Sequence, residues 1–156
     1  VMNEYGYTTS AENISRLQHS TRFDNLPPDI MIIYMGNNDA LVQNLNTANF
    51  EKSYRNMLNN LYTLYPNIQL FLGTLSYEKY FVGKDYYEEH VLVTAEVNRI
   101  IQSLASEYNL PIIDFATAYS DSSYLFDTIH PNVLGMKALA NVAIDAISKF
   151  YNPTTI

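Results

Sequence analysis

Short, nearly continuous apolar runs alternate along this chain with longer stretches in which apolar residues recur every three or four positions. The clearest run covers residues 30–35 and lies between Pro27-Pro28-Asp29 and Gly36-Asn37-Asn38-Asp39. Similar runs cover residues 68–72 and 111–115. Apolar runs without polar alternation predict strands that are buried on both faces, as in a parallel sheet.

Three amphipathic stretches predict helices, because their apolar positions fall on one face with a 3.6-residue period. The stripes are Phe50, Tyr54, Met57, Leu58, Leu61 and Leu64; Val93, Val97, Ile100, Ile101 and Leu104; and Met136, Leu139, Ala140, Ala143, Ile147 and Phe150. A shorter helix is predicted near Thr9, which has capping-box spacing to Glu12. Strands that alternate with helices predict an α/β domain with a parallel sheet and right-handed crossovers.

Length and composition narrow the class of protein. A chain of 156 residues fits one domain over residues 1–156, and its net charge of −7 argues against a duplex nucleic-acid binder. The absence of cysteine excludes disulfides, thiolate chemistry and cysteine zinc sites. No apolar run approaches the about 18–20 residues of a membrane span.

The first candidate cluster is Gly36-Asn37-Asn38-Asp39, directly after the clearest apolar run. In parallel α/β sheets ligands bind where strands end, so this position favours a functional site. Gly36 permits a sharp turn, and Asn38 would present an amide donor that could stabilise an oxyanion. An ordinary turn, in which Asn38 or Asp39 caps the next helix, explains the same residues.

The second cluster is Asp127-Thr128-Ile129-His130-Pro131, just before the last predicted helix. A carboxylate three residues before a histidine can accept from Nδ1–H and leave the other ring nitrogen free as a general base. We therefore expect an Asp127 oxygen within roughly 2.6–3.2 Å of His130 Nδ1. A surface turn with Pro131 near the helix start is the alternative. His19 and His90 stand in polar surroundings and are predicted to be surface residues.

Two weaker features complete the set of candidates. Gly6 is predicted to lie in a polar turn that leads into a helix, where its N–H could donate to an anion. The alternative is an ordinary turn glycine. Residues 77–87 form an aromatic-rich loop that begins at Tyr77. This loop could be a platform for an acyl chain or a sugar ring, or it could pack onto its own domain.

Together these clusters resemble the SGNH (GDSL-like) hydrolase family of esterases, lipases and acylhydrolases. Four blocks mark that family: a Gly-Asp-Ser nucleophile turn, a glycine turn, a G-x-N-D turn and a D-x-x-H-P turn. Residues 36–39 match the third block, residues 127–131 match the fourth, and Gly6 corresponds to the second. The resemblance implies a three-layer α/β/α, flavodoxin-like fold.

The resemblance also implies a serine ester hydrolase that needs no cofactor and no metal. Gly6 and Asn38 would donate to the oxyanion, His130 would be the base, and Asp127 would orient it. Substrate contacts are assigned to Asn37 and Tyr77, and Asp114 resembles an acidic residue that has a structural role in the family.

The nucleophile block is absent, since Gly-Asp-Ser does not occur in this sequence. The family places that block upstream, so the resemblance implies that the first strand and first helix are missing and that the chain alone is inactive. Residues 1–3 would then end the family's second strand. We expect a complement that covers the exposed edge of residues 30–35: an N-terminal fragment carrying the serine, or a second copy of the chain.

Two other functions remain open from the residues alone. The strand ends could bind a small ligand or a carbohydrate without catalysing a reaction. The domain could also be a flavodoxin-like phosphate or nucleotide binder, but the lack of a glycine-rich phosphate loop counts against this.

Overall fold

The computed structural model describes residues 27–41, 44–76, 87–119, 122–127 and 130–152 of the chain. Within them, a parallel sheet has the strand order β1-β2-β3. The strands are β1 (Ile30–Ile33), β2 (Gln69–Gly73) and β3 (Ile112–Ile113). The main helices are α3 (Thr47–Leu64), α4 (Tyr87–Glu107) and α5 (Val133–Tyr151).

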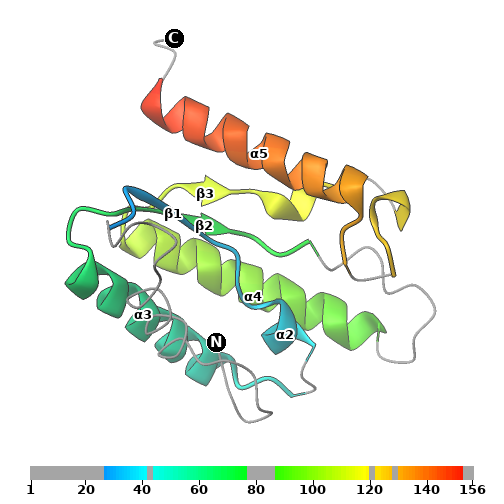
Figure 1. The fold of residues 1–156 in the computed structure, drawn as a ribbon. Helices are drawn as coiled ribbons and strands as arrows, with labels where there is room; N and C mark the ends of the chain where they lie inside the picture. The colour runs from blue at the N-terminus through cyan, green and yellow to red at the C-terminus, as the bar shows by residue number, and fades with distance from the viewer. Residues whose placement is uncertain (1–26, 42–43, 77–86, 120–121, 128–129, 153–156) are drawn as a thin grey trace.

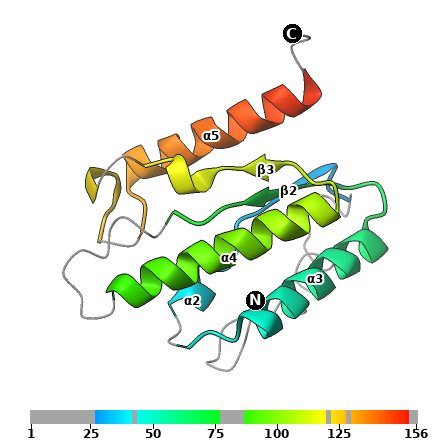
Figure 2. The ribbon, with the colours of Figure 1, turned by 180° about the vertical axis from the view of Figure 1, so that it is seen from behind.

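Helices cover both faces of this sheet. α3 and α4 lie on one face and α5 lies on the other (Figure 1), and the view from behind shows the same three layers (Figure 2). The predicted α/β/α arrangement with a parallel sheet is therefore confirmed. None of the helices in the described part of the chain is long and apolar enough to cross a membrane.

The layer between the sheet and α3 and α4 contains the larger core. The predicted stripes on both helices are confirmed, because Phe50, Tyr54 and Leu58 on α3 and Val97 and Ile101 on α4 are fully buried there. The amide of Asn46 caps α3 by accepting from Asn49 N at 3.0 Å, and α3 ends before Tyr65-Pro66, where proline prevents its continuation.

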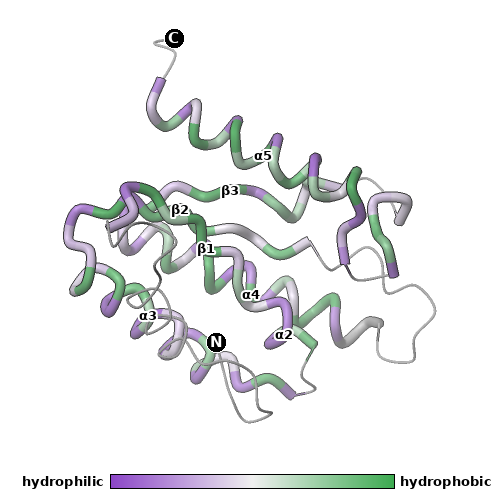
Figure 3. Tube along the Cα trace, viewed as in Figure 1, coloured by the Kyte–Doolittle hydropathy of each residue, from purple (hydrophilic) through white to green (hydrophobic). Residues whose placement is uncertain are grey.

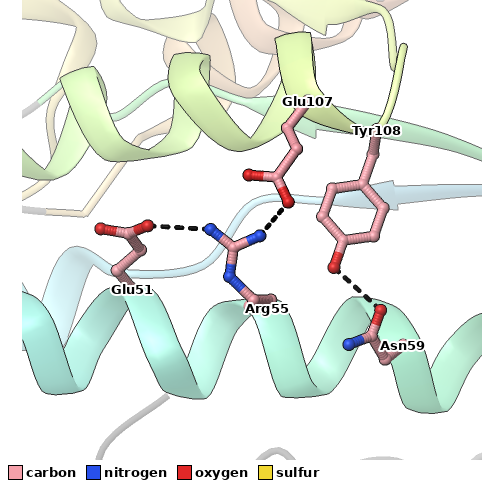
Figure 4. A network of polar contacts seen from close by, with 5 residues as sticks. All are labelled: Glu51, Arg55, Asn59, Glu107 and Tyr108. Atoms are coloured by element: carbon pink, nitrogen blue, oxygen red, sulfur yellow. Dashed lines mark hydrogen bonds and ion pairs between the residues drawn. The ribbon is translucent and has the colours of Figure 1, made fainter.

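Polar contacts join the outer sides of α3 and α4 (Figure 4). Arg55 on α3 donates to Glu107 on α4 and, at 2.9 Å, to Glu51 one turn earlier on its own helix. Hydrogen bonds to Glu107 and then to Glu51 raise the pKa of Arg55, so its charge is fixed. Tyr108 donates to Asn59 at 2.8 Å, which adds a second bridge between these segments.

Strand β2 is buried on both faces as predicted, since Leu70, Phe71 and Leu72 are fully buried. The same prediction is wrong for β1, where Ile30 and Ile32 are 38% and 39% exposed. The reason is the position of α5, whose apolar residues pack on Phe71 of β2 and on the β3 region but leave part of β1 uncovered.

The apolar stripe predicted on α5 is only partly correct. Leu139, Ala143 and Ile147 pack toward the sheet, and the ring centre of Phe150 lies 5.3 Å from that of Phe71. Met136 is 57% exposed, although it belongs to the predicted stripe. Hydrophobic positions occur along the whole of α5 (Figure 3), so the helix carries more apolar surface than it buries against the described sheet.

Candidate active site

The chain turns sharply after β1 at Gly36, which has φ +122° and precedes the one-turn helix α2 (Asn37–Ala40). Residues other than glycine rarely adopt this φ, so the predicted role of Gly36 is confirmed. α2 has no side-chain cap, which disfavours the interpretation of Asn38 or Asp39 as a capping residue. Asn38 is exposed, whereas Asp39 is buried.

Helix α4 supports this turn through His90. The His90 Nδ1 atom lies 3.0 Å from the Ala40 carbonyl oxygen, and because a carbonyl only accepts, Nδ1 carries the proton. His90 is only 7% exposed, so its prediction as a surface residue is wrong. The polar neighbours in sequence were misleading, whereas the helical spacing from His90 to Thr94, Val97 and Ile101, which are all buried, would have placed it on the inner face.

The neighbouring amide, Asn37, has a different environment. Its Oδ1 atom is buried and has no hydrogen-bond partner among the residues that the structure describes. A buried acceptor without a partner costs about 1–3 kcal/mol, so a donor from a bound molecule would be favourable at this position. The substrate contact expected for Asn37 stays a prediction.

Two short arms, residues 124–127 and 130–132, pair as a hairpin before α5 and bring Asp127 close to His130. Leu125 and Pro131 form an antiparallel bridge, and Phe126 N donates to the His130 carbonyl at 2.7 Å. The Asp127 Oδ1 atom accepts from His130 N at 2.8 Å, and its Oδ2 atom lies 2.8 Å from His130 Nδ1. The expected contact between the carboxylate and the ring is therefore present.

This contact fixes the chemistry available to the ring. An ionised carboxylate can only accept, so the proton of a neutral His130 lies on Nδ1 and Nε2 has a free lone pair. The His130 side chain is 73% exposed and that of Asp127 is 44% exposed, so Nε2 is accessible to a reacting group. A ring held in this way is able to take a proton at Nε2 from a group that approaches it.

Side-chain hydrogen bonds hold the segments that follow β2 and β3. Thr74 donates to Asp114 Oδ1 at 2.9 Å, which agrees with the structural role expected for Asp114. The side-chain amide of Asn98 on α4 makes two hydrogen bonds to the backbone of Leu75. Its Oδ1 atom accepts from the Leu75 N–H at 2.6 Å, and its Nδ2 atom donates to the Leu75 carbonyl at 3.0 Å. Thr74 and Asn98 were missed by sequence reasoning, because partners 40 and 23 residues away leave no local pattern.

The structure places α2 and the two arms of the hairpin, residues 124–127 and 130–132, at the same end of the sheet, where the strands end (Figures 1 and 2). The elements that carry Asn38 and the pair Asp127–His130 therefore lie at the same end of the sheet. Gly6, Tyr77 and the helix expected near Thr9 lie outside the described residues, as does the rest of the aromatic loop up to residue 86.

Solved structures share this fold. A GDSL-like lipase from Bacteroides thetaiotaomicron has a TM-score of 0.66 at 18% identity over 92% of this chain and 72% of its own. A catalytic mutant of an acetylxylan esterase from Geobacillus stearothermophilus has a TM-score of 0.67 at 19% identity over 90% and 68%. An α/β hydrolase from the metagenome of Lake Arreo, Spain, has a TM-score of 0.63 at 20% identity over 89% and 67%.

These likenesses confirm the flavodoxin-like SGNH hydrolase fold. A comparison with curated proteins found no match. The sequence model of the GDSL-like lipase/acylhydrolase family matches residues 4–138 of this chain. This range includes Asn38 and the hairpin that carries Asp127 and His130. The chain therefore belongs to the GDSL-like lipase/acylhydrolase family.

Proposed function

We propose that this chain supplies the acid–base pair and the oxyanion donors of a serine ester hydrolase. The contact between Asp127 and His130 carries the proposal, because it orients the ring and leaves Nε2 free. His130 is the base, Asp127 orients it, and Asn38 and the N–H of Gly6 are the oxyanion donors. Family membership supports a hydrolase, whereas the ester specificity and these roles belong to the proposal.

The reaction follows from this assignment. The serine oxygen attacks the ester carbonyl while His130 Nε2 takes the hydroxyl proton, and the carbonyl oxygen becomes an oxyanion that Asn38 and Gly6 stabilise. His130 then gives the proton to the leaving alcohol, and an acyl-enzyme remains. Water activated by the same nitrogen releases the acid and regenerates the serine.

The nucleophile is assigned to a complement, because this sequence has no Gly-Asp-Ser. We propose that an N-terminal fragment carries the serine; a second copy of the chain could cover the edge of β1 but would bring no Gly-Asp-Ser. The exposed Ile30 and Ile32 side chains on one face of β1 support a partner that covers this part of the sheet, since exposed apolar surface favours association. The substrate is a small ester held by Asn37 and Tyr77.

Ester hydrolysis with and without the complement tests this function. The chain alone should neither turn over a short-chain aryl ester nor be labelled by a serine-directed fluorophosphonate. The chain with the serine-bearing fragment should do both, and Asp127→Asn should then reduce kcat by about 10⁴, because the wrong tautomer is favoured.

A matched variant separates catalysis from general charge effects. Glu96→Gln also replaces a carboxylate with an amide, but Glu96 pairs with Arg99 on the outside of α4 and should leave kcat unchanged. Mass spectrometry identifies any labelled residue. Stoichiometric labelling of a serine within these 156 residues would overturn the assignment of the nucleophile.

A further inference from the structure

Asn132 connects the beginning of α5 to the opposite side of the Asp127–His130 hairpin. Its Oδ1 atom caps α5 by accepting from Leu134 N at 2.9 Å and Gly135 N at 3.1 Å. Its Nδ2 atom donates to the carbonyls of Ser123 at 2.7 Å and Leu125 at 3.2 Å. The acceptor and both donor hydrogens of the amide are therefore used.

The two donated bonds are not part of the helix cap. Serine, threonine and aspartate cap helices as well as asparagine does, since capping needs only an accepting oxygen. Nδ2 instead holds the segment of residues 123–125 that enters the hairpin, and Asn132 N adds a bond to the Tyr124 carbonyl at 2.9 Å. Asp127 lies two residues after Leu125, and His130 lies two residues before Asn132.

We propose that Asn132 is a positioning residue for the acid–base pair. Its amide fixes both arms of the hairpin on the rigid end of α5, so that the Asp127 carboxylate faces His130 Nδ1. This inference rests on the proposed function for its catalytic meaning, but the geometry that it asserts can be measured without a reaction.

Asn132→Asp separates capping from positioning. The carboxylate keeps the accepted bonds and suits a helix N-terminus, but it cannot donate and it repels the Ser123 and Leu125 carbonyls. Asn46→Asp is the matched control, because Asn46 caps α3 through an accepted bond. Asn132→Ser is a second capping variant that lacks the amide donors.

Nitrogen-15 NMR of the histidine rings in the 156-residue chain measures the effect directly. Wild type and Asn46→Asp should show His130 protonated on Nδ1, with the signal assigned from its loss in His130→Asn. Both Asn132 variants should show a mixture of the two tautomers. With the serine-bearing complement, they should also lose about 10²-fold in kcat with little change in KM, because misplaced reacting groups slow the chemical step.

The outcomes distinguish this inference from the proposed function. An unchanged Nδ1–H tautomer in a folded Asn132→Asp or Asn132→Ser chain would overturn the inference, whatever the activity. Unfolding of both variants while Asn46→Asp stays folded would also overturn it, because the amide would then hold the fold. The His130 tautomer could change in the Asn132 variants even though the wild-type complex hydrolyses no ester. That result would support the inference and contradict the proposed function.

Discussion

Tyr54 has an unusual environment for a polar side chain. It is fully buried between α3 and the sheet, and its hydroxyl has no hydrogen-bond partner in the described part of the chain. The sequence predicted the burial, because Tyr54 lies on the apolar stripe of α3, but it could not show that the hydroxyl finds no acceptor. Burial raises the pKa of Tyr54 above its ordinary value, since the phenolate would be desolvated.

Replacing Tyr54 with phenylalanine should stabilise the protein. The ring packing is kept and the unpaired hydroxyl is removed, so the free energy of unfolding should rise by about 1–3 kcal/mol at neutral pH. Urea unfolding followed by circular dichroism measures the change. Tyr62→Phe on the same helix is the control, because Tyr62 is only half-buried and should change stability little. A loss of stability in Tyr54→Phe would indicate a hydrogen bond to the hydroxyl.

The raised pKa of Tyr54 also predicts an alkaline effect. The unfolded chain loses the Tyr54 proton near pH 10, but the folded chain keeps it to higher pH. The contribution of this tyrosine to the free energy of unfolding is therefore constant below pH 10. Above pH 10 the free energy of unfolding falls by up to about 1.4 kcal/mol per pH unit. The free energy of unfolding of Tyr54→Phe should therefore exceed that of the wild type by a larger amount above pH 10 than below it. A difference that stays constant from about pH 8 to pH 11 would contradict the burial of Tyr54.

Asn38 allows a kinetic test of the oxyanion assignment. Asn38→Ala in the complemented enzyme should lower kcat by about 10²–10³ with a smaller effect on KM, because the donor acts mainly in the transition state. Steady-state hydrolysis of an aryl ester gives both constants. Asn49→Ala, an exposed asparagine on α3, is the control. A change confined to KM would instead assign Asn38 to substrate binding.

At the scale of elements, the sequence predicted where helices and strands occur better than which of their faces are covered. The stripes on α3 and α4 were correct because these helices cover the sheet together. The exposed side of β1 and the exposed Met136 on α5 depend on how many helices share the second face, which local periodicity does not encode. For the site, the spacing of Asp127 and His130 was enough to predict their contact, whereas His90, Thr74 and Asn98 act through distant partners.

The junction between α5 and the hairpin has no spare room. A Cβ atom at Gly135 would lie 2.3 Å from the Tyr124 carbonyl oxygen and 2.9 Å from Pro131. Gly135→Ala should therefore lower the free energy of unfolding by about 1–3 kcal/mol, although alanine has the higher helix propensity by about 1 kcal/mol.

Asn141→Ala is the matched control for Gly135→Ala. Asn141 is exposed on the same helix, so the higher helix propensity of alanine should raise stability by about 0.5 kcal/mol. Thermal unfolding of both variants measures the two effects. Equal stabilisation of both variants would show that α5 and the hairpin do not pack tightly.

At the scale of the whole molecule, exposed apolar residues are concentrated on one side. Ile30 and Ile32 on β1 and Met136 and Ile144 on α5 are all more than one-third exposed, and both elements border the face opposite α3 and α4. Such a surface favours association, because large apolar patches are uncommon on monomeric proteins.

We therefore expect the chain without its complement to associate. Light scattering after sizing chromatography should give a mass above the 17.9 kDa of one chain. Ile32→Lys should reduce the association, whereas Leu92→Lys, at a 72% exposed position on α4 behind the sheet, should not. A stable wild-type monomer with cooperative unfolding would show that this side is covered in another way.

The hydrogen bonds between Asp127 and His130 also have a consequence for the order of folding. They close a loop of only three residues, whereas the parallel pairing of Ile30 with Gln69 that anchors the Asn38 turn spans 39 residues. Closing the longer loop costs about 2 kcal/mol more chain entropy. Local contacts also form faster than distant ones. During refolding, the Asp127–His130 contact can thus form together with the first turn of α5, and Asn38 reaches its position only when the sheet has formed.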